Sequence, residues 1–193
     1  RAACDLLLRA GARVTALDPN DTGALRAETR PLAERGARIL LGADTVPDGP
    51  FKLVVVSPAI PSSSPLVAAA LERGWKVTGE LELAYQALRC LSVAVTGTNG
   101  KGSVAELIER LLTHEDRKVV MAGPRTRPVC EVVEETARAD FLLLQVNAFQ
   151  LEWVEFFRPA VAVLTNLTPD HLDRYGSMED YLRATARVFA RQQ

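Results

Sequence analysis

Residues 91–103 read LSVAVTGTNGKGS, and this stretch decides the fold. Residues 91–95 form an apolar run that leads directly into a glycine-rich segment, which predicts a buried strand. Five apolar residues then follow at helical spacing: Val104, Leu107, Ile108, Leu111 and Leu112. A glycine loop between a strand and an amphipathic helix binds anions, because backbone N–H groups and the helix dipole attract negative charge. The stretch therefore predicts a site for a nucleoside triphosphate.

Residues 96–103, called the glycine loop below, carry the predicted contacts with ATP. Gly97 and Gly100 let the backbone bend towards the phosphates. Lys101 would reach the β- and γ-phosphates, and Ser103 would hold Mg²⁺. The remaining residues expected to contact the nucleotide are Thr98, Asn99 and Gly102.

The glycine loop departs from the usual Gly-x-x-x-x-Gly-Lys pattern in two ways. Val95 occupies the position of the first glycine, and Gly102 separates Lys101 from the hydroxyl of Ser103. A plain glycine turn is the alternative interpretation. The flanking strand and amphipathic helix favour the nucleotide site, because they supply the structural context that the motif requires.

The rest of the chain alternates short apolar strands with helices, which predicts an α/β fold with mainly parallel sheets. Strands are expected at residues 13–18, 37–41, 51–57, 75–78, 118–121, 141–146 and 160–166. Helices are expected at residues 2–10, 22–35, 65–73, 130–138 and about 178–191. A helix precedes the first strand and no strand follows the last helix, so we expect the chain to be part of a longer protein.

Composition limits the class of protein. The net charge is −1, with 48% hydrophobic and 24% charged residues, which does not favour binding to a nucleic-acid polymer or an anionic membrane. The apolar runs are shorter than the roughly 20 residues of a membrane-spanning helix. Three widely spaced cysteines suggest neither a disulfide framework nor a metal site. We therefore expect a cytoplasmic protein, and a monomer.

The glycine loop resembles that of the Mur ligase and folylpolyglutamate synthase superfamily, whose members carry the motif TGTNGK followed by small hydroxyl residues. Four further segments resemble those of the Mur ligases that add D-glutamate, and they occur in the same order. These segments are SPAI at residues 57–60, GELEL at 79–83, FQLE at 149–152 and NLTPDHLDRY at 166–175. The resemblance therefore covers essentially the whole chain.

The resemblance implies an ATP-dependent amide ligase of peptidoglycan precursor synthesis. In that reaction ATP phosphorylates the carboxylate of UDP-N-acetylmuramoyl-L-alanine, and the amine of D-glutamate attacks the acyl phosphate. The catalytic residues implied are Lys101 and His171, with His171 also binding a second Mg²⁺. Asp18, Ser57 and Pro58 correspond to positions that bind the UDP substrate.

The resemblance also implies a domain organisation. Residues 1–90 would form a Rossmann-like domain that binds the UDP substrate and lacks its first strand. Residues 91–193 would form an incomplete Mur ligase central domain that binds ATP. The third domain of the family, which binds the incoming amino acid, would be absent.

Several positions differ from the family pattern. The glutamate that binds magnesium in the family is Gln145, which keeps an oxygen ligand without the negative charge. The two serines before FQLE are Asn147 and Ala148, and the carbamylated lysine of the last helix is Thr185. The GNIG turn reads GPRT at residues 123–126. These changes leave open a catalytically inactive nucleotide-binding paralogue.

A folylpolyglutamate synthase-like ligase is another alternative, because that branch of the superfamily carries the motif GTNGKGS. That branch lacks a comparable N-terminal UDP-binding domain, which argues against this alternative.

Two interpretations are independent of the family. His171 could cap the loop before the last helix, and four aromatic residues at helical spacing would form one face of a helix in the core: Phe149, Trp153, Phe156 and Phe157. Tyr181, Thr185 and Val188 would share one face of the last helix, with Thr185 towards the loop of His171.

Overall fold

The computed structural model describes residues 1–124 and 126–192, and it divides into two compact units. The first unit contains Arg1–Val55 and Ser62–Val77, and the second contains Val56–Pro61 and Thr78–Gln193. The contacts therefore assign residues 78–90 to the second unit, whereas the predicted boundary at residue 90 placed them in the first domain. One physical reason is that the GELEL segment forms helix α4 (Glu80–Tyr85), which packs on helices of the second unit.

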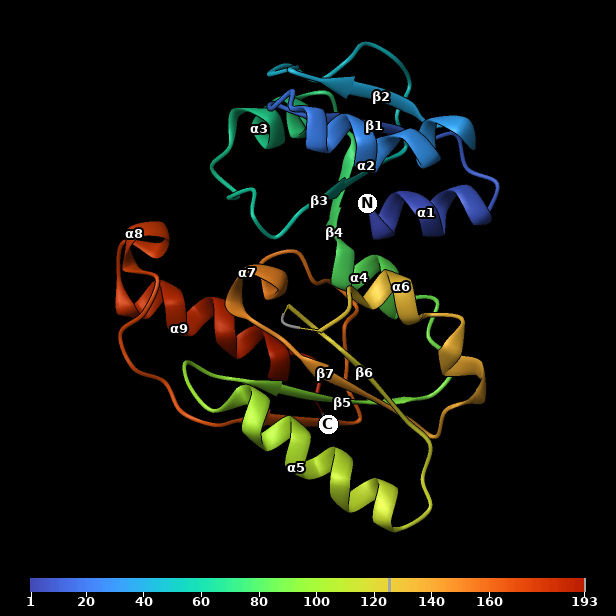
Figure 1. Cartoon of the computed structure of the whole chain (residues 1–193). Coiled ribbons are helices and arrows are strands. Elements are labelled where there is room, and N and C mark those ends of the chain that lie inside the picture. The colour runs from blue at the N-terminus through green and yellow to red at the C-terminus, as the bar shows by residue number, and fades with distance from the viewer. Residues whose placement is uncertain (125, 193) are drawn as a thin grey trace. The chain divides into compact units, whose positions relative to one another are not determined.

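The first unit is built from short strands and helices in alternation (Figure 1). Its elements are α1 (Ala2–Arg9), β1 (Thr15–Asp18), α2 (Gly23–Glu34), β2 (Arg38–Leu41), β3 (Leu53–Val56), α3 (Pro65–Glu72) and β4 (Lys76–Gly79), of which the last residues of β3 and β4 belong to the second unit. Strands β1 and β2 pair in parallel, and β3 pairs with β4. Its core contains three buried side chains, which pack against residues of α1 and β2: Val14, Leu32 and Ala37.

The second unit contains a four-stranded sheet in the order β6-β7-β5-β8. Its strands are β5 (Leu91–Thr96), β6 (Val119–Ala122), β7 (Phe141–Gln145) and β8 (Val161–Leu164), and the three pairings are all parallel. Helix α5 (Lys101–His114) covers one face, whereas α4, α6 (Val129–Val132) and α7 (Ala148–Leu151) lie on the other (Figure 1). The expected α/β fold with parallel sheets is confirmed.

Side chains alternate across strand β7, as expected for a strand covered on both faces. Leu143 packs with Val93 and Val95 of β5 and with Ala105 of α5. Its neighbour Leu144 is fully buried as well, with an exposed fraction of 0%. Because both faces of β5 and β7 are covered, the carboxyl ends of these strands are fixed beneath the glycine loop.

Two helices are shorter than the sequence predicts. The helix expected at 130–138 is α6 followed by a 3₁₀ turn (Glu135–Arg138). The hydroxyl of Thr136 donates to the carbonyl oxygen of Val133 at 2.5 Å, and such local bonds compete with helix continuation. The last helix is α9 (Met178–Ala186), which tightens into a 3₁₀ turn (Arg187–Phe189) instead of continuing to residue 191.

The aromatic helix face was a wrong prediction. Helix α7 ends at Leu151, so of the four aromatic residues it contains only Phe149. Phe157 is buried, whereas 45% of Phe156 is exposed. Helices α7 and α8 (Leu172–Tyr175) were not predicted, because four residues carry too little periodicity. Within the described residues, no helix is long and apolar enough to cross a membrane.

Candidate nucleotide site

The glycine loop begins where β5 ends and finishes inside the first turn of α5. Gly100 is the residue before the helix and adopts a left-handed conformation, with φ of 81°. Gly97 has φ of +132°, and a Cβ atom there would lie 2.8 Å from the carbonyl oxygen of Asn166 and even closer to the hydroxyl of Thr165. Position 97 therefore has room only for glycine. The glycine lets the loop backbone pack directly against the segment after β8, which fixes the shape of the loop.

Lys101 lies over the backbone of the glycine loop. Its Nζ atom donates to the carbonyl oxygens of Gly97 at 2.6 Å and Thr98 at 2.9 Å. The ammonium group is thus placed at the N-terminus of α5, a helix of 14 residues whose dipole adds positive potential at the same point. The predicted phosphate-binding lysine and the predicted helix N-terminus occur together.

A segment of residues 165–168, which follows β8, holds the glycine loop in place. Asn99 N–H donates to Asn166 Oδ1 at 2.9 Å, and Asn166 Nδ2 donates back to the carbonyl oxygen of Asn99 at 2.8 Å. The hydroxyl of Thr165 also donates to the carbonyl oxygen of Asn99 at 2.7 Å. Thr98 Oγ1 accepts from the N–H of Thr168 at 3.0 Å and donates to its carbonyl oxygen at 3.1 Å.

The hydroxyl oxygen of Tyr181, on α9, lies 3.2 Å from Thr98 Oγ1. Sequence reasoning did not name Thr165, Asn166, Thr168 or Tyr181 as residues of the site. The sequence pointed to two of these residues only, because Asn166 and Thr168 belong to the NLTPDHLDRY segment that resembles the family. The segment's position beside the glycine loop follows from the pairing of β8 with β5.

Gln145 lies at the carboxyl end of β7, directly beside the glycine loop. Its backbone pairs in register with Val95, and only 6% of the residue is exposed. Its Oε1 atom lies 3.8 Å from the point that a Cβ atom on Gly102 would occupy. Gly123 approaches from the other side with φ of +146°, and a Cβ atom there would come within 2.8 Å of Gln145 Cβ. The predicted counterpart of the GNIG turn includes position 125, which lies outside the described residues.

His171 precedes α8 and has a left-handed backbone, with φ of 53°. Its side chain makes no capping hydrogen bond, so the position caps α8 only by backbone geometry. The imidazole ring lies 4.6 Å from the ring of Phe149 and 6.2 Å from that of Tyr181, measured between centroids. Its Nε2 atom lies 3.5 Å from Asp170 Oδ2, and 42% of the side chain is exposed.

Thr185 and Tyr181 are buried on α9 and Val188 is buried in the 3₁₀ turn that follows it, with exposed fractions of 2%, 3% and 0%. The shared helix face that the sequence predicts is therefore buried in full. The hydroxyl of Thr185 donates to the carbonyl oxygen of Tyr181 at 2.9 Å, within the same helix. This bond directs the hydroxyl to the backbone of its own helix.

The residues predicted to bind magnesium near the glycine loop lack the carboxylate ligands that this ion prefers. Magnesium prefers carboxylate oxygens in octahedral geometry. The predicted set of Ser103, Gln145 and His171 offers neutral oxygens and an imidazole. Among the described residues, no group of three or more His, Cys, Asp or Glu side chains could hold a metal ion.

The predicted substrate residues belong to different units. Asp18, in the first unit, ends β1, and its Oδ1 atom accepts hydrogen bonds from the backbone N–H of Asn20 at 2.9 Å and from Asn20 Nδ2 at 3.1 Å. Ser57 and Pro58 lie in a turn of the second unit, closed by the bond from Ile60 N–H to the carbonyl oxygen of Ser57 at 2.9 Å. Their role with a substrate stays a prediction.

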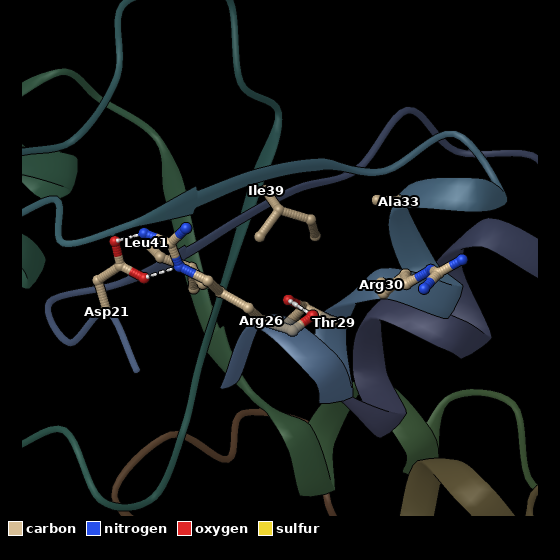
Figure 2. Close-up of a pocket in the computed structure, with 7 residues that line it drawn as sticks. All are labelled: Asp21, Arg26, Thr29, Arg30, Ala33, Ile39 and Leu41. Atoms are coloured by element: carbon tan, nitrogen blue, oxygen red, sulfur yellow. Dashed lines mark hydrogen bonds and ion pairs between the residues drawn. The ribbon is translucent and has the colours of Figure 1, made fainter. Parts of the chain in front are cut away.

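A shallow groove in the first unit lies between α2 and β2 (Figure 2). Arg26 crosses this groove and forms a paired contact with Asp21, at 2.7 and 2.6 Å. Asp18 is not one of its lining residues: Asp21, Arg26, Thr29, Arg30, Ala33, Ile39 and Leu41. Asp21 neutralises the charge of Arg26, so this arginine is not available to bind an anion in the groove.

Comparison with known proteins shows one family for this chain. Residues 95–193 match the family model described as the Mur ligase middle domain. A UDP-N-acetylmuramoylalanine–D-glutamate ligase of Geobacter metallireducens is 38% identical over 188 residues, which are 97% of this chain and 42% of that protein. The corresponding ligase of Pelotomaculum thermopropionicum is 40% identical over 96% of this chain and 41% of its own length. The chain thus spans about four-tenths of these relatives.

A solved structure shows the same fold. The UDP-N-acetylmuramate:L-alanyl-γ-D-glutamyl-meso-diaminopimelate ligase from Neisseria meningitides matches 98% of this chain and 63% of its own, with a TM-score of 0.56 and 16% identity. At that identity the likeness concerns the fold.

Proposed function

Because this chain belongs to the Mur ligase family, we propose that it acts in the ATP-dependent joining of D-glutamate to UDP-N-acetylmuramoyl-L-alanine, a step of peptidoglycan precursor synthesis. The names of the relatives supply the substrates of this proposal. One structural observation carries it: Lys101 lies over a loop that admits only glycine at position 97, at the N-terminus of α5.

The proposed reaction forms an acyl phosphate and then an amide. Phosphoryl transfer of this kind depends mainly on positioning and on neutralising charge. Lys101 and the N–H groups of the glycine loop would hold the phosphates, and the bonds from residues 165–168 would keep the loop in its binding shape. Since Ser103, Gln145 and His171 supply no carboxylate, we propose that Mg²⁺ arrives bound to the phosphates of ATP.

Calorimetry with Mg-ATP tests the nucleotide site. Lys101→Ala should weaken binding by roughly tenfold or more, because a charge-assisted hydrogen bond contributes about 1.5–3 kcal/mol. Lys118→Ala is the matched control, since Lys118 is exposed outside the loop and should keep the affinity of the starting protein. Equal affinities for the Lys101→Ala and Lys118→Ala proteins would contradict the proposed site.

A second candidate is a nucleotide-binding protein without ligase activity, and two observations favour it. Gln145 stands beside the loop without a negative charge, and the hydroxyl of Thr185 is bonded to its own helix. Measuring ATP affinity with and without Mg²⁺ separates the candidates. A Gln145→Glu variant that gains both Mg²⁺ dependence and ligase rate would support the second candidate, whereas turnover by the unchanged protein would exclude it.

A folate-type ligase keeps only the Gly102-Ser103 pair in its favour. Thermal protection by UDP-N-acetylmuramoyl-L-alanine without protection by a folate would exclude it. The reverse result would contradict the proposed substrate.

A further inference from the structure

One guanidinium group, that of Arg174 on α8, joins three separate segments of the second unit. It forms a paired contact with Glu152, from Nε to Oε1 at 3.0 Å and from Nη2 to Oε2 at 2.8 Å. The side chains are only 13% and 10% exposed. Such planar, two-bond pairing fixes the orientation of the guanidinium as well as its position.

The FQLE segment holds Arg174 on two sides. Glu152 follows α7, and Phe149 lies on the same side of that turn, three residues earlier. The guanidinium carbon lies 4.2 Å from the centre of the Phe149 ring, a cation–π distance. The hydroxyl of Tyr175 also donates to Glu152 Oε1, at 2.7 Å. Burial and the neighbouring carboxylate raise the pKa of Tyr175, so this hydroxyl stays protonated as a donor.

The two terminal nitrogen atoms of Arg174 also bond the turn at residues 57–60, called the 57–60 turn below. Nη1 donates to the carbonyl oxygen of Pro58 at 2.8 Å, and Nη2 donates to that of Ile60 at 3.2 Å. These bonds join residues that are 116 and 114 positions apart in the sequence. Both the turn and Arg174 belong to the second unit, so the contact lies within one compact body.

Arg174 also stands close in sequence to the residues that hold the glycine loop. It follows Thr168, which exchanges two hydrogen bonds with Thr98, and His171, whose ring lies against Phe149. The segment at residues 165–175 therefore contacts the glycine loop at its beginning and the 57–60 turn at its end. Five residues separate Thr168 from Arg174, so one short segment carries both contacts.

We propose that Arg174 is a positioning residue that sets the place of the 57–60 turn, and thereby the affinity for the nucleotide-sugar substrate, without contacting ATP. This proposal rests on the proposed function and on the family resemblance, which implies that Ser57 and Pro58 bind that substrate. Arg174 acts through the carbonyl oxygens of the turn. Lysine cannot replace it fully, because an ammonium group lacks the planar fork that reaches Glu152 and the turn together.

The test uses the 193-residue chain and three variants. Arg174→Met with Glu152→Gln removes both buried charges together, because a single change would leave an unpaired buried charge and strongly destabilise the protein. Arg174→Lys keeps the charge and loses the fork. Arg183→Met is the control, since Arg183 is 68% exposed on α9 and pairs only with neighbouring residues of that helix in the contacts described.

Two measurements are made on each protein: calorimetry with UDP-N-acetylmuramoyl-L-alanine and with Mg-ATP, and hydrogen–deuterium exchange of residues 57–61 and 96–103. The double variant should lose about tenfold or more in affinity for the nucleotide-sugar, with less than about threefold change for Mg-ATP. Exchange should increase at 57–61 and stay unchanged at 96–103. Arg174→Lys should fall between the double variant and the control.

Different results overturn different statements. Equal losses for both ligands would mean that Arg174 has only a general structural role, and would overturn the proposal. Unchanged affinity for the nucleotide-sugar would overturn it too, whether or not exchange of the turn increases. If the unchanged chain binds Mg-ATP but not the nucleotide-sugar, the proposed function fails, and the proposal for Arg174 fails with it. This result is distinguishable from the others because the unchanged protein alone reveals it.

Discussion

Asn166 and Asn99 are joined by two reciprocal hydrogen bonds, in which the side-chain amide of Asn166 replaces a backbone partner for the N–H and the carbonyl oxygen of Asn99. Asn99 lies at the tip of the glycine loop, immediately before Gly100 and the first turn of α5. A loop that binds phosphate must hold its N–H groups in place before the ligand arrives. The structure assigns part of this task to a residue outside the loop.

The first prediction concerns this pair. Asn166→Ala should lower the free energy of unfolding by about 1 kcal/mol, because two neutral hydrogen bonds are lost at an exposed position. It should also weaken Mg-ATP binding measured by calorimetry. Thr113→Ala, at an exposed position on α5, is the control for nucleotide affinity and should leave it unchanged. Unchanged nucleotide affinity in Asn166→Ala would show that the loop keeps its shape without the pair.

Gly97 and Gly100 should respond differently to alanine. Both have positive φ, so each substitution carries backbone strain of roughly 1–3 kcal/mol. Only at Gly97 would the new Cβ atom also collide with Thr165 and Asn166, whereas open space surrounds Gly100. Urea unfolding should therefore show a larger loss of stability for Gly97→Ala than for Gly100→Ala. Equal losses would indicate that the segment at 165–168 moves away at little cost.

Gly102 should accept a side chain. It lies in α5 without a positive φ, and a Cβ atom would meet only Gln145 Oε1, at an ordinary distance of 3.8 Å. Gly102→Ala should stabilise the protein by about 0.5–1 kcal/mol through helix propensity. Gly23→Ala, at the start of α2 with open space around it, is the matched comparison in thermal unfolding. A gain at Gly23 without one at Gly102 would mean that Gln145 restricts the loop.

Glu80 should make stability depend on pH. Burial raises the pKa of this carboxyl above its usual value of 4.5, although the Cys130 N–H, at 2.6 Å from Oε1, acts in the opposite direction. Between the unfolded and folded pKa values the folded state binds more protons. Stability is therefore complete below the unfolded pKa and falls as pH rises through the folded one.

Glu80→Gln should remove this decrease, because glutamine keeps an acceptor for Cys130 and does not ionise. The stability difference between the variant and the unchanged protein should be small near pH 4, about the unfolded pKa, and should increasingly favour the variant at higher pH. Urea unfolding across this range measures it. The exposed Glu106→Gln serves as the control, and a Glu80→Gln curve parallel to that of the unchanged protein would contradict the assignment.

The sequence by itself determined the strand, the loop and the helix of residues 91–114. An apolar run, two glycines and a helical period act over neighbouring residues, so β5, Gly100 and α5 follow from local pattern. The same patterns determined the parallel α/β class. The resemblance in motif order also identified the family, which the match over residues 95–193 confirmed.

Local pattern failed where elements are short. Helix α7 has a capping box between Asn147 and Gln150, and this spacing is visible in the sequence, but four residues show no period. The aromatic residues after it keep helical spacing without a helix, because residues 155–157 turn their N–H groups to the buried carboxylate of Glu82. That carboxylate is 73–75 positions away in the chain.

Only the tertiary structure decided what surrounds the glycine loop and the 57–60 turn. Because β8 pairs with β5, the residues after β8 run past the loop and supply Thr165, Asn166 and Thr168. Arg174 then reaches a turn 116 positions earlier. Strand order depends on which packed arrangement buries the most apolar surface over the whole unit, and no local pattern encodes it.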